Sequence, residues 1–301
     1  MKKLLFSIAV ILLALTSNTS YAQDIIDADD ENNFTNYFQK KNFQGRSAIP
    51  YAHLRESDVV WETAIWRSVD FREKFNQYFY FPTSLTENTQ GRINLANALL
   101  RAWENGDIEA FLDDDLKKPA DFTVQTKKLG EPVTNEVKIE DEDGMLVGTG
   151  EFTYDTLPYS VDRIFGIRLK EFWYIEKQDT RQKVRIVALA LIYNRCVSRA
   201  GGDGEEETRT CTDREVAWFP MNDMRVRNVL VKANAYDENN TNAERSYDDI
   251  FIDRFFDSYV LRESNRFNRT IASYAVGEDA LLLSQEIETR LGDIESDMWE
   301  Y

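Results

Sequence analysis

The residue types that most often carry out catalysis are rare in this chain. It contains one histidine, His53, and two cysteines, Cys196 and Cys211. A Ser-His-Asp triad or a histidine-based metal site would depend on His53, which lies in a polar stretch. The motifs Gly-x-Ser-x-Gly, His-Glu-x-x-His and Gly-x-x-x-x-Gly-Lys-Ser/Thr do not occur in the sequence. The sequence therefore predicts no catalytic residue, no cofactor-binding residue and no metal ligand.

Carboxylates are abundant, at 53 of 301 residues, and they leave two kinds of site open. Two acids at a suitable separation beside aromatic rings would suit a carbohydrate-active enzyme. The acidic runs Asp113–Asp115 and Asp141–Asp143 could bind Ca²⁺ in a ligand-binding module, but neither fits a twelve-residue calcium loop. Asp248 and Asp249 precede a predicted helix, where negative charge interacts favourably with the helix dipole. We interpret the runs as solvated turns and these two aspartates as capping residues, and both site types remain alternatives.

The first residues of the chain predict export. Two lysines precede an apolar run, Leu4–Leu15, and the small-x-small sequence Ser20–Ala22 follows it. This order is typical of a secretory signal peptide, and the apolar run is too short to span a bilayer. We expect cleavage between Ala22 and Gln23, which removes residues 1–22. Gln23 stands where a lipoprotein would have a cysteine, so we expect a periplasmic protein that is not itself anchored.

The two cysteines agree with export to an oxidising compartment. Cys196 and Cys211 flank a loop rich in Gly and Glu between two strand-like runs. A disulfide between them would constrain the unfolded chain and contribute about 3 kcal/mol to stability. Two unpaired thiols are the alternative. We predict the disulfide.

The charge of the chain excludes some partners. Its formal net charge is −17, from 36 basic and 53 acidic residues. Nucleic acids and anionic lipids are bound through patches of lysine and arginine, so we expect no nucleic acid and no bare membrane as a partner. A basic protein or divalent cations would suit this surface. With 43% hydrophobic residues, the chain has enough apolar material for a folded core.

The order of predicted elements indicates an α+β fold. Residues 23–47 lack any regular period, so we expect a flexible acidic arm, followed by a single globular domain at 48–301. An antiparallel sheet meander in the middle of this domain would pack against N-terminal and C-terminal helices. Its strands are predicted at Ile164–Ile175, Lys183–Tyr193 and Val216–Phe219, which are rich in β-branched and aromatic residues.

The N-terminal helices are predicted from apolar residues that recur every three or four positions. The first would start after Ser57 and run through Val69, and the second would cover Ile93–Trp103. Asp107–Leu116 would add a short helical turn. One or two strands would surround a turn at residues 140–144.

The C-terminal part is predicted to be mostly helical. Arg225–Lys232 alternates in polarity and could be a strand or a lead-in to a loop. Ser246 and Asp249 form a capping box ahead of the apolar series Ile252–Val260, which predicts a helix through that series. A last helix is predicted at Glu278–Ile294.

Several longer sequences resemble a known family. They are Arg55–Trp61, Trp66–Asn76 and Tyr80–Pro82 near the N-terminus, and Arg245–Phe251 continuing to Asn265 near the C-terminus. Together these two blocks resemble the gliding-motility family GldN, called PorN in non-gliding relatives. The resemblance runs from Arg55 to the C-terminus.

This resemblance implies a non-enzymatic periplasmic subunit of the type IX secretion and gliding machinery of Bacteroidota. Members of the family associate with an outer-membrane lipoprotein, the K component, in a large ring, and contact the periplasmic region of the motor's M component. Such a subunit is held at the outer membrane by its partner, without direct membrane insertion. In the predicted first helix, Trp66 would lie about 100° around the axis from Ile65, so it is a candidate interface residue, with burial in the core as the alternative. The resemblance places the two blocks at the border of the interfaces, which adds Tyr247 and Phe251 as candidates.

Overall fold

The computed structural model describes residues 46–83, 92–129, 132–140, 146–156, 161–199, 208–237 and 245–297. Contacts within the chain divide it into two units, Met1–Lys41 and Asn42–Tyr301. Every described residue belongs to the second unit.

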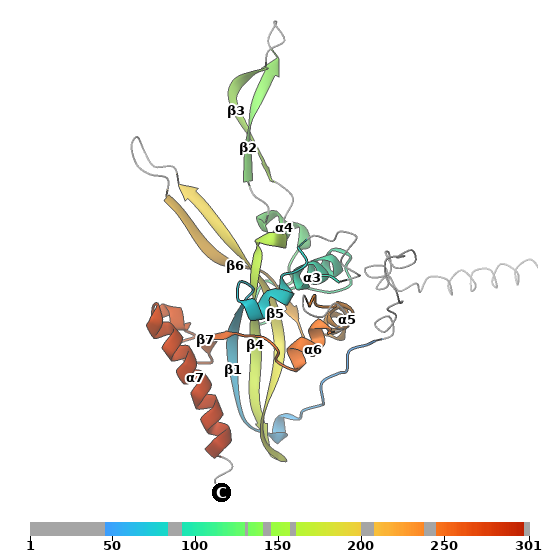
Figure 1. Ribbon diagram of the computed structural model, residues 1–301, viewed down its shortest axis with the longest axis vertical. Helices are drawn as coiled ribbons and strands as arrows, with labels where there is room; N and C mark the ends of the chain where they lie inside the picture. The colour runs from blue at the N-terminus through green and yellow to red at the C-terminus, as the bar shows by residue number, and fades with distance from the viewer. Residues whose placement is uncertain are drawn as a thin grey trace, which may run out of the picture. The chain divides into compact units, whose positions relative to one another are not determined.

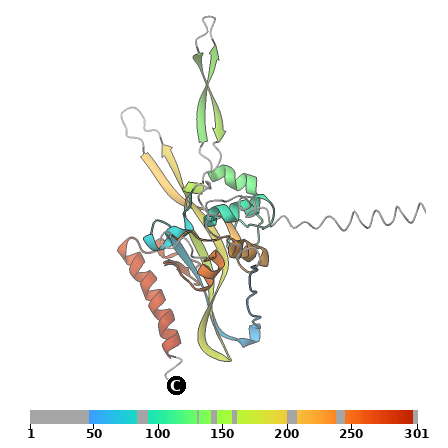
Figure 2. The same cartoon turned by 45° about the vertical axis from the view of Figure 1, so that its right-hand side comes forward.

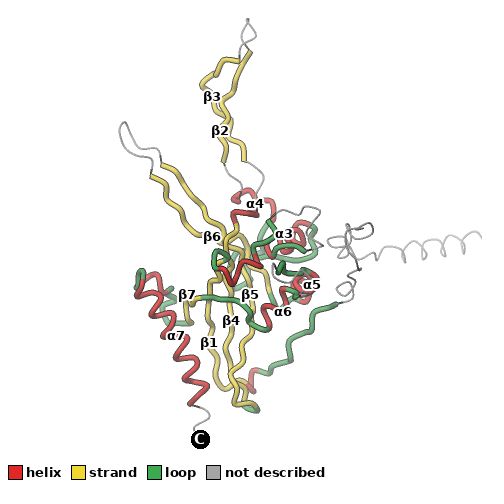
Figure 3. Tube along the Cα trace, viewed as in Figure 1, coloured by secondary structure: helices red, strands yellow, loops and turns green. Residues whose placement is uncertain are grey.

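The centre of this unit is a five-stranded antiparallel sheet with the strand order β6-β5-β4-β1-β7 (Figure 1). Its strands are β1 (Val59–Asp70), β4 (Ile164–Glu176), β5 (Asp179–Arg199), β6 (Thr208–Pro220) and β7 (Tyr259–Glu263). Strands β4, β5 and β6 follow one another along the chain, so the predicted meander is confirmed. Strands β1 and β7 come from far apart in the sequence and extend the sheet beyond β4 (Figure 3).

The middle of β5 is buried on both faces of the sheet. The four residues from Ala188 to Leu191 have no exposed surface. Consecutive side chains in a strand point to opposite faces. Core residues therefore pack against both faces here, and the α+β class is confirmed.

In the part of the chain that the structure describes, five α-helices accompany the sheet. They are α3 (Leu95–Glu104), α4 (Phe122–Leu129), α5 (Met224–Lys232), α6 (Tyr247–Ile252) and α7 (Glu278–Asp297). Short 3-10 helices are η2 (Glu56–Asp58), η3 (Lys74–Phe79), η4 (Val161–Arg163) and η5 (Ile271–Ser273). Helix α7 lies beside β7 and β1, whereas α3, α5 and α6 gather on the opposite side of the view in both Figure 1 and Figure 2. Helices α3 and α7 confirm two of the predicted helices, and α4 was not predicted.

A second sheet has two strands, β2 (Pro132–Glu140) and β3 (Leu146–Thr156), paired antiparallel. This pair confirms the strands predicted around residues 140–144. Of the turn predicted there, Glu140 is the last residue of β2, and 141–144 lie outside the described residues together with the acidic run Asp141–Asp143.

The prediction of a helix from Ser57 through Val69 was wrong, because this segment is strand β1. Its apolar residues Trp61, Ile65 and Val69 are four positions apart. A spacing of four places residues on one side of a helix, but it also places them on one face of a strand, whose period is two. The many β-branched and aromatic residues favour the strand, and β1 pairs with β4 over its whole length.

The same ambiguity affected Arg225–Lys232, which was predicted as a strand or loop and is helix α5. Its buried residues Val226 and Leu230 are four apart and share one face of the helix. The helix begins at Asp223, whose carboxylate accepts a hydrogen bond from the backbone N–H of Arg225 at 2.9 Å. This capping signal was available in the sequence.

The predicted helical turn at Asp107–Leu116 was also wrong. Phe111 instead forms an isolated bridge to β6, in which its backbone N–H and carbonyl exchange hydrogen bonds of 2.8 and 2.7 Å with Trp218. These backbone groups are therefore paired with the sheet and are not available for a helix.

The predicted capping box of Ser246 and Asp249 is confirmed at the start of α6, but the helix does not continue to Val260. It ends at Ile252, and Arg254 has a positive φ of 52°. A left-handed residue stops a helix. Tyr259 and Val260 then join β7 and pair with β1, where Val260 is buried and Tyr259 stays exposed.

A cluster of aromatic side chains joins the region after β1 to α6. The ring of Phe79, which has no exposed surface, lies 5.6 Å from that of Phe71, 5.8 Å from Tyr247 and 5.5 Å from Phe251. Aromatic pairs at such separations add to the free energy of burying their surface. Phe79 is therefore the centre of the contact between two segments that are distant in sequence.

We predict that Phe79→Ala lowers the free energy of unfolding by about 3–5 kcal/mol, because it leaves a cavity among buried rings. Phe267→Ala is the matched control, since Phe267 is 67% exposed, and its effect should stay within about 0.5 kcal/mol. Denaturant unfolding of both variants measures the difference. Equal effects of the two substitutions would contradict the packing described.

Candidate interaction surface

Two segments from the two blocks of sequence meet at the surface of the protein. The rings of Phe75 on η3 and Phe255 after α6 are 4.8 Å apart and are 48% and 40% exposed. Ile252, three residues before Phe255, is 53% exposed. The guanidinium of Arg245 lies 4.2 Å from the centre of the Phe255 ring. We call the rings of Phe75 and Phe255, together with the side chain of Ile252, the aromatic surface.

Buried polar groups hold the two segments of the aromatic surface together. The side-chain amide of Asn76, which has no exposed surface, donates to the backbone carbonyls of Asp70 at 3.0 Å and Asp257 at 2.9 Å. Its carbonyl oxygen accepts from the backbone N–H of Asp257 at 2.9 Å. A buried amide with these partners is costly to displace. Asn76 therefore fixes the position of Phe75 relative to Phe255.

Two tyrosines complete this support. Tyr78 donates its hydroxyl to the carbonyl of Phe255, and Tyr247 donates to the carbonyls of Tyr78 at 3.1 Å and Ile93 at 3.0 Å. Burial raises the pKa of both phenols above the usual value, because it disfavours the phenolate. Both hydroxyls are therefore protonated donors at neutral pH, and they serve the fold.

The structure places the three candidate interface residues in different surroundings. Tyr247 and Phe251 are 0% and 2% exposed, so they lie behind the aromatic surface and support it. Trp66 on β1 is half-buried; its indole N–H donates to Asp114 at 2.9 Å, and the guanidinium of Arg262 lies 3.5 Å from its ring centre. The exposed residues Ile252 and Phe255 were not predicted as surface residues, because they belong to the apolar series from which a helix through Val260 was predicted. Phe75 was not singled out from the sequence.

A buried carboxylate links the sheet to both C-terminal elements. Glu171 on β4 has no exposed surface. It accepts hydrogen bonds from Arg254 at 2.8 Å and from the indole of Trp173 at 3.0 Å, and the Nε of Arg67 lies 3.2 Å from it without hydrogen-bond alignment. Arg67 also pairs with Glu288 on α7. Two guanidinium groups compensate the charge of this carboxylate, and an indole N–H donates a further hydrogen bond to it. Glu171 is therefore part of a structural ion-pair network.

A second buried ion pair explains one of the two aspartates at the start of α6. Arg227 on α5 and Asp248 form a bidentate pair with distances of 2.9 and 2.7 Å, and their side chains are 1% and 5% exposed. The ring of Tyr51 covers the guanidinium at 4.5 Å. Asp249, its neighbour, makes the capping box. Both residues therefore serve the fold, and Asp248 does so by pairing with an arginine.

The acidic run Asp113–Asp115 is partnered by groups of the same chain. The carboxylate of Asp113 accepts from the backbone N–H of Lys117, and Asp114 accepts from Arg262. Hydrogen bonds from Lys117 and Lys170 lower the pKa of Asp115. Asp114 and Asp115 are thus paired with cations, and Asp113 is held by backbone N–H groups. Among the residues that the structure describes, no group of three His, Cys, Asp or Glu side chains is placed to hold a metal ion.

The backbone register brings the two cysteines together. Cys196 on β5 and Cys211 on β6 are directly paired in the antiparallel ladder. Directly paired residues have neighbouring Cβ atoms, which favours the predicted disulfide. Their side chains are outside the described part, so the bond stays a prediction.

The predicted signal peptide, its cleavage point between Ala22 and Gln23, and nearly all of the acidic arm at 23–47 also lie outside the described residues. Within the described part of the chain, none of the helices is both long enough and apolar enough to cross a membrane.

We predict that Glu171→Gln lowers the free energy of unfolding by about 3–5 kcal/mol, because it leaves the buried Arg67 and the half-buried Arg254 without their shared carboxylate. Glu288→Gln is the matched control, since Glu288 is 39% exposed and pairs with only one of these arginines. Its effect should be about 1 kcal/mol or less. Thermal or denaturant unfolding compares them, and a mild effect of Glu171→Gln would show that the network does not hold the C-terminal elements.

The aromatic surface and its supports lie inside a region that matches a described family. A sequence model of the gliding motility associated protein GldN matches residues 54–300. A search among curated proteins found no match. The matched range includes β1, the whole sheet and α7. The chain therefore belongs to the GldN family of gliding motility associated proteins, components of the gliding and type IX secretion machinery.

Proposed function

We propose that this protein is a non-enzymatic structural subunit of the type IX secretion machinery that works in the periplasm. It is repeated in a ring with the K-component outer-membrane lipoprotein and contacts the periplasmic region of the M component. The predicted signal peptide supports export of the chain. Gln23 stands where a lipoprotein would have a lipid-bearing cysteine, which supports anchoring through a partner.

The observation that carries this proposal is the family match over residues 54–300 together with the aromatic surface inside it. Phe75, Ile252 and Phe255 are large apolar side chains that the core does not use. Aromatic residues exposed on a rigid support are typical of protein interfaces. Asn76 and Tyr78 provide that support, so the surface is preorganised for a partner.

Buried ion pairs between separate elements of the fold agree with a role as a mechanical link. The buried carboxylate of Glu171 and the pair of Arg227 with Asp248 join separate elements of the fold. A subunit that transmits force between partners needs large interfaces and a fold that resists deformation. The family is a component of secretion machinery and not a known enzyme family, which supports a function without catalysis.

A carbohydrate-active enzyme gains no support from the described residues. A groove in the described part of the chain holds two carboxylates, Asp279 and Glu286, which lie on the same helix. Both residues are exposed, whereas a site for a carbohydrate substrate is a cleft that encloses its ligand. A cation-binding module likewise lacks a described cluster of ligands.

We predict that Phe255→Asp weakens assembly of the mature chain with the K component and the periplasmic region of the M component by at least about tenfold, because a charge replaces a central apolar contact. Phe75→Asp, on the other segment, should act in the same direction. Val124→Asp on α4 is the matched control, since Val124 is also exposed, at 52%. Light scattering of the mixed components measures assembly, and circular dichroism checks folding.

The proposed function would be overturned if the wild-type chain formed no assembly with these components. If both aromatic variants assembled like the Val124→Asp control, the aromatic surface would not be the interface.

Export has its own test. We predict that the chain isolated from the cell envelope begins at Gln23 and is two hydrogens lighter than its dithiol form, because the signal peptide is removed and Cys196 pairs with Cys211. Intact-mass measurement after alkylation without a reductant gives both results. A chain that still begins at Met1, or one that carries two alkylated cysteines, would contradict the corresponding prediction.

A further inference from the structure

The helix α7 uses one face to hold itself on the sheet. Ile287 and Leu291 are buried in a cluster with Ile65 of β1 and Val260 of β7. Ser284, which is 3% exposed, accepts a hydrogen bond from the backbone N–H of Val260 at 2.8 Å. These contacts account for the docking of the helix. Near the N-terminal end of the helix, Ala280 and Leu283 also pack against this cluster, whereas Leu281 and Leu282 are not part of it.

The N-terminal end of α7 and the turn before it expose large apolar side chains in a short stretch. Tyr274 and Val276 are 56% and 84% exposed, and Leu281 and Leu282 are 57% and 56% exposed. Single exposed apolar residues are ordinary, but a contiguous group marks an interaction site. The fold gains little from these four residues, because the buried face of α7 is already complete.

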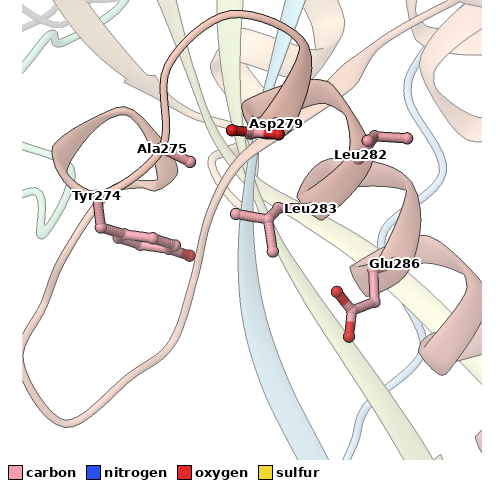
Figure 4. Close-up of a pocket in the computed structure, with 6 residues that line it drawn as sticks. All are labelled: Tyr274, Ala275, Asp279, Leu282, Leu283 and Glu286. Atoms are coloured by element: carbon pink, nitrogen blue, oxygen red, sulfur yellow. The ribbon is translucent and has the colours of Figure 1, made fainter.

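A groove of about 410 Å³ lies among these residues (Figure 4). It is lined by Tyr274, Ala275, Asp279, Leu282, Leu283 and Glu286. Figure 4 shows Leu283 pointing toward the ring of Tyr274, with Glu286 one turn farther along the helix. The volume falls within the range of about 300–1,000 Å³ that is usual for sites that bind small molecules or side chains. We call it the α7 groove.

The charges around the α7 groove are of one sign. Asp279 and Glu286 are its only charged lining residues, and within the described part of the chain neither forms an ion pair. Arg290, one turn beyond Glu286, pairs with Glu263 of β7. An apolar segment that enters the groove would therefore gain from lysine or arginine on both sides of its apolar residue.

From this geometry we infer that the α7 groove is a docking site for a segment of another protein that carries apolar side chains at helical spacing flanked by lysine or arginine. Its apolar residues contact Tyr274 and Leu282, and its basic residues pair with Asp279 and Glu286. This is the arrangement in which an amphipathic helix is bound in a groove. The site is separate from the aromatic surface and goes beyond the proposed function by giving the subunit a second kind of contact.

The test uses the full mature chain and a short fluorescent peptide of leucine, lysine and alanine with leucines at helical spacing. We expect the peptide to bind the wild type and to bind Leu282→Asp at least about tenfold more weakly. Val124→Asp on α4 is the matched control, because it adds the same charge at another exposed apolar residue, and it should bind like the wild type. Fluorescence anisotropy at physiological salt gives the affinities.

Exchanging the two acidic residues of the groove for lysines shows whether the peptide binds the groove or is only attracted by the negative charge of the whole protein. The double variant Asp279→Lys with Glu286→Lys should no longer bind the lysine peptide, and it should bind a peptide in which glutamate replaces each lysine. Tyr274→Asp provides a second apolar variant, and circular dichroism shows whether each variant is folded.

The inference is overturned if the lysine peptide does not bind, if Leu282→Asp and Val124→Asp affect it equally, or if the glutamate peptide gains nothing from the double variant. It is also overturned if Leu282→Asp changes the self-association of the chain, because the occupant would then be a second copy. None of these results depends on the K or M component, so a failure here is distinct from a failure of the assembly test.

Discussion

The buried carboxylate of Glu171 is the constraint on which the C-terminal half of the fold depends. It lies on β4, and its partners Arg67 and Arg254 come from β1 and from the residue that ends α6. A buried charge is tolerated only when it is compensated, so these segments must meet at one point. Arg254 is held there in a left-handed conformation, and the chain turns into β7. Through Arg67 and Glu288 the same network reaches α7.

The two exposed surfaces follow from this arrangement. Because the helix of α6 stops at Ile252, the next residues can approach η3, and Asn76 binds the backbone of Asp257 there. This brings Phe255 beside Phe75. Because α7 is fixed through one face, the other side of its N-terminal end is left to solvent with Leu281 and Leu282. A strongly acidic chain with two exposed apolar regions is suited to partners that bring apolar and basic groups.

The sequence predicted the parts of the fold that depend on local signals. The meander, α3, α7 and the capping box at Ser246 could be predicted because their periods, turns and caps are unambiguous. Strand β1 and helix α5 were predicted wrongly, because apolar residues four apart satisfy both a strand and a helix; residue composition in β1 and the cap at Asp223 before α5 are the signals that distinguish the two. The aromatic surface also escaped prediction, because its formation depends on the non-local hydrogen bonds of Asn76. The family resemblance identified the right blocks but not which of their residues are exposed.

In the function that we propose, this subunit acts by being held between partners in a large assembly. The most direct measurement is the size of the species that contains this chain after extraction of the cell envelope with mild detergent, together with identification of the proteins that remain bound. We predict that the chain, whose full length has a mass of 35.1 kDa, migrates in a far larger particle with the K component. A free, monodisperse monomer would contradict the account.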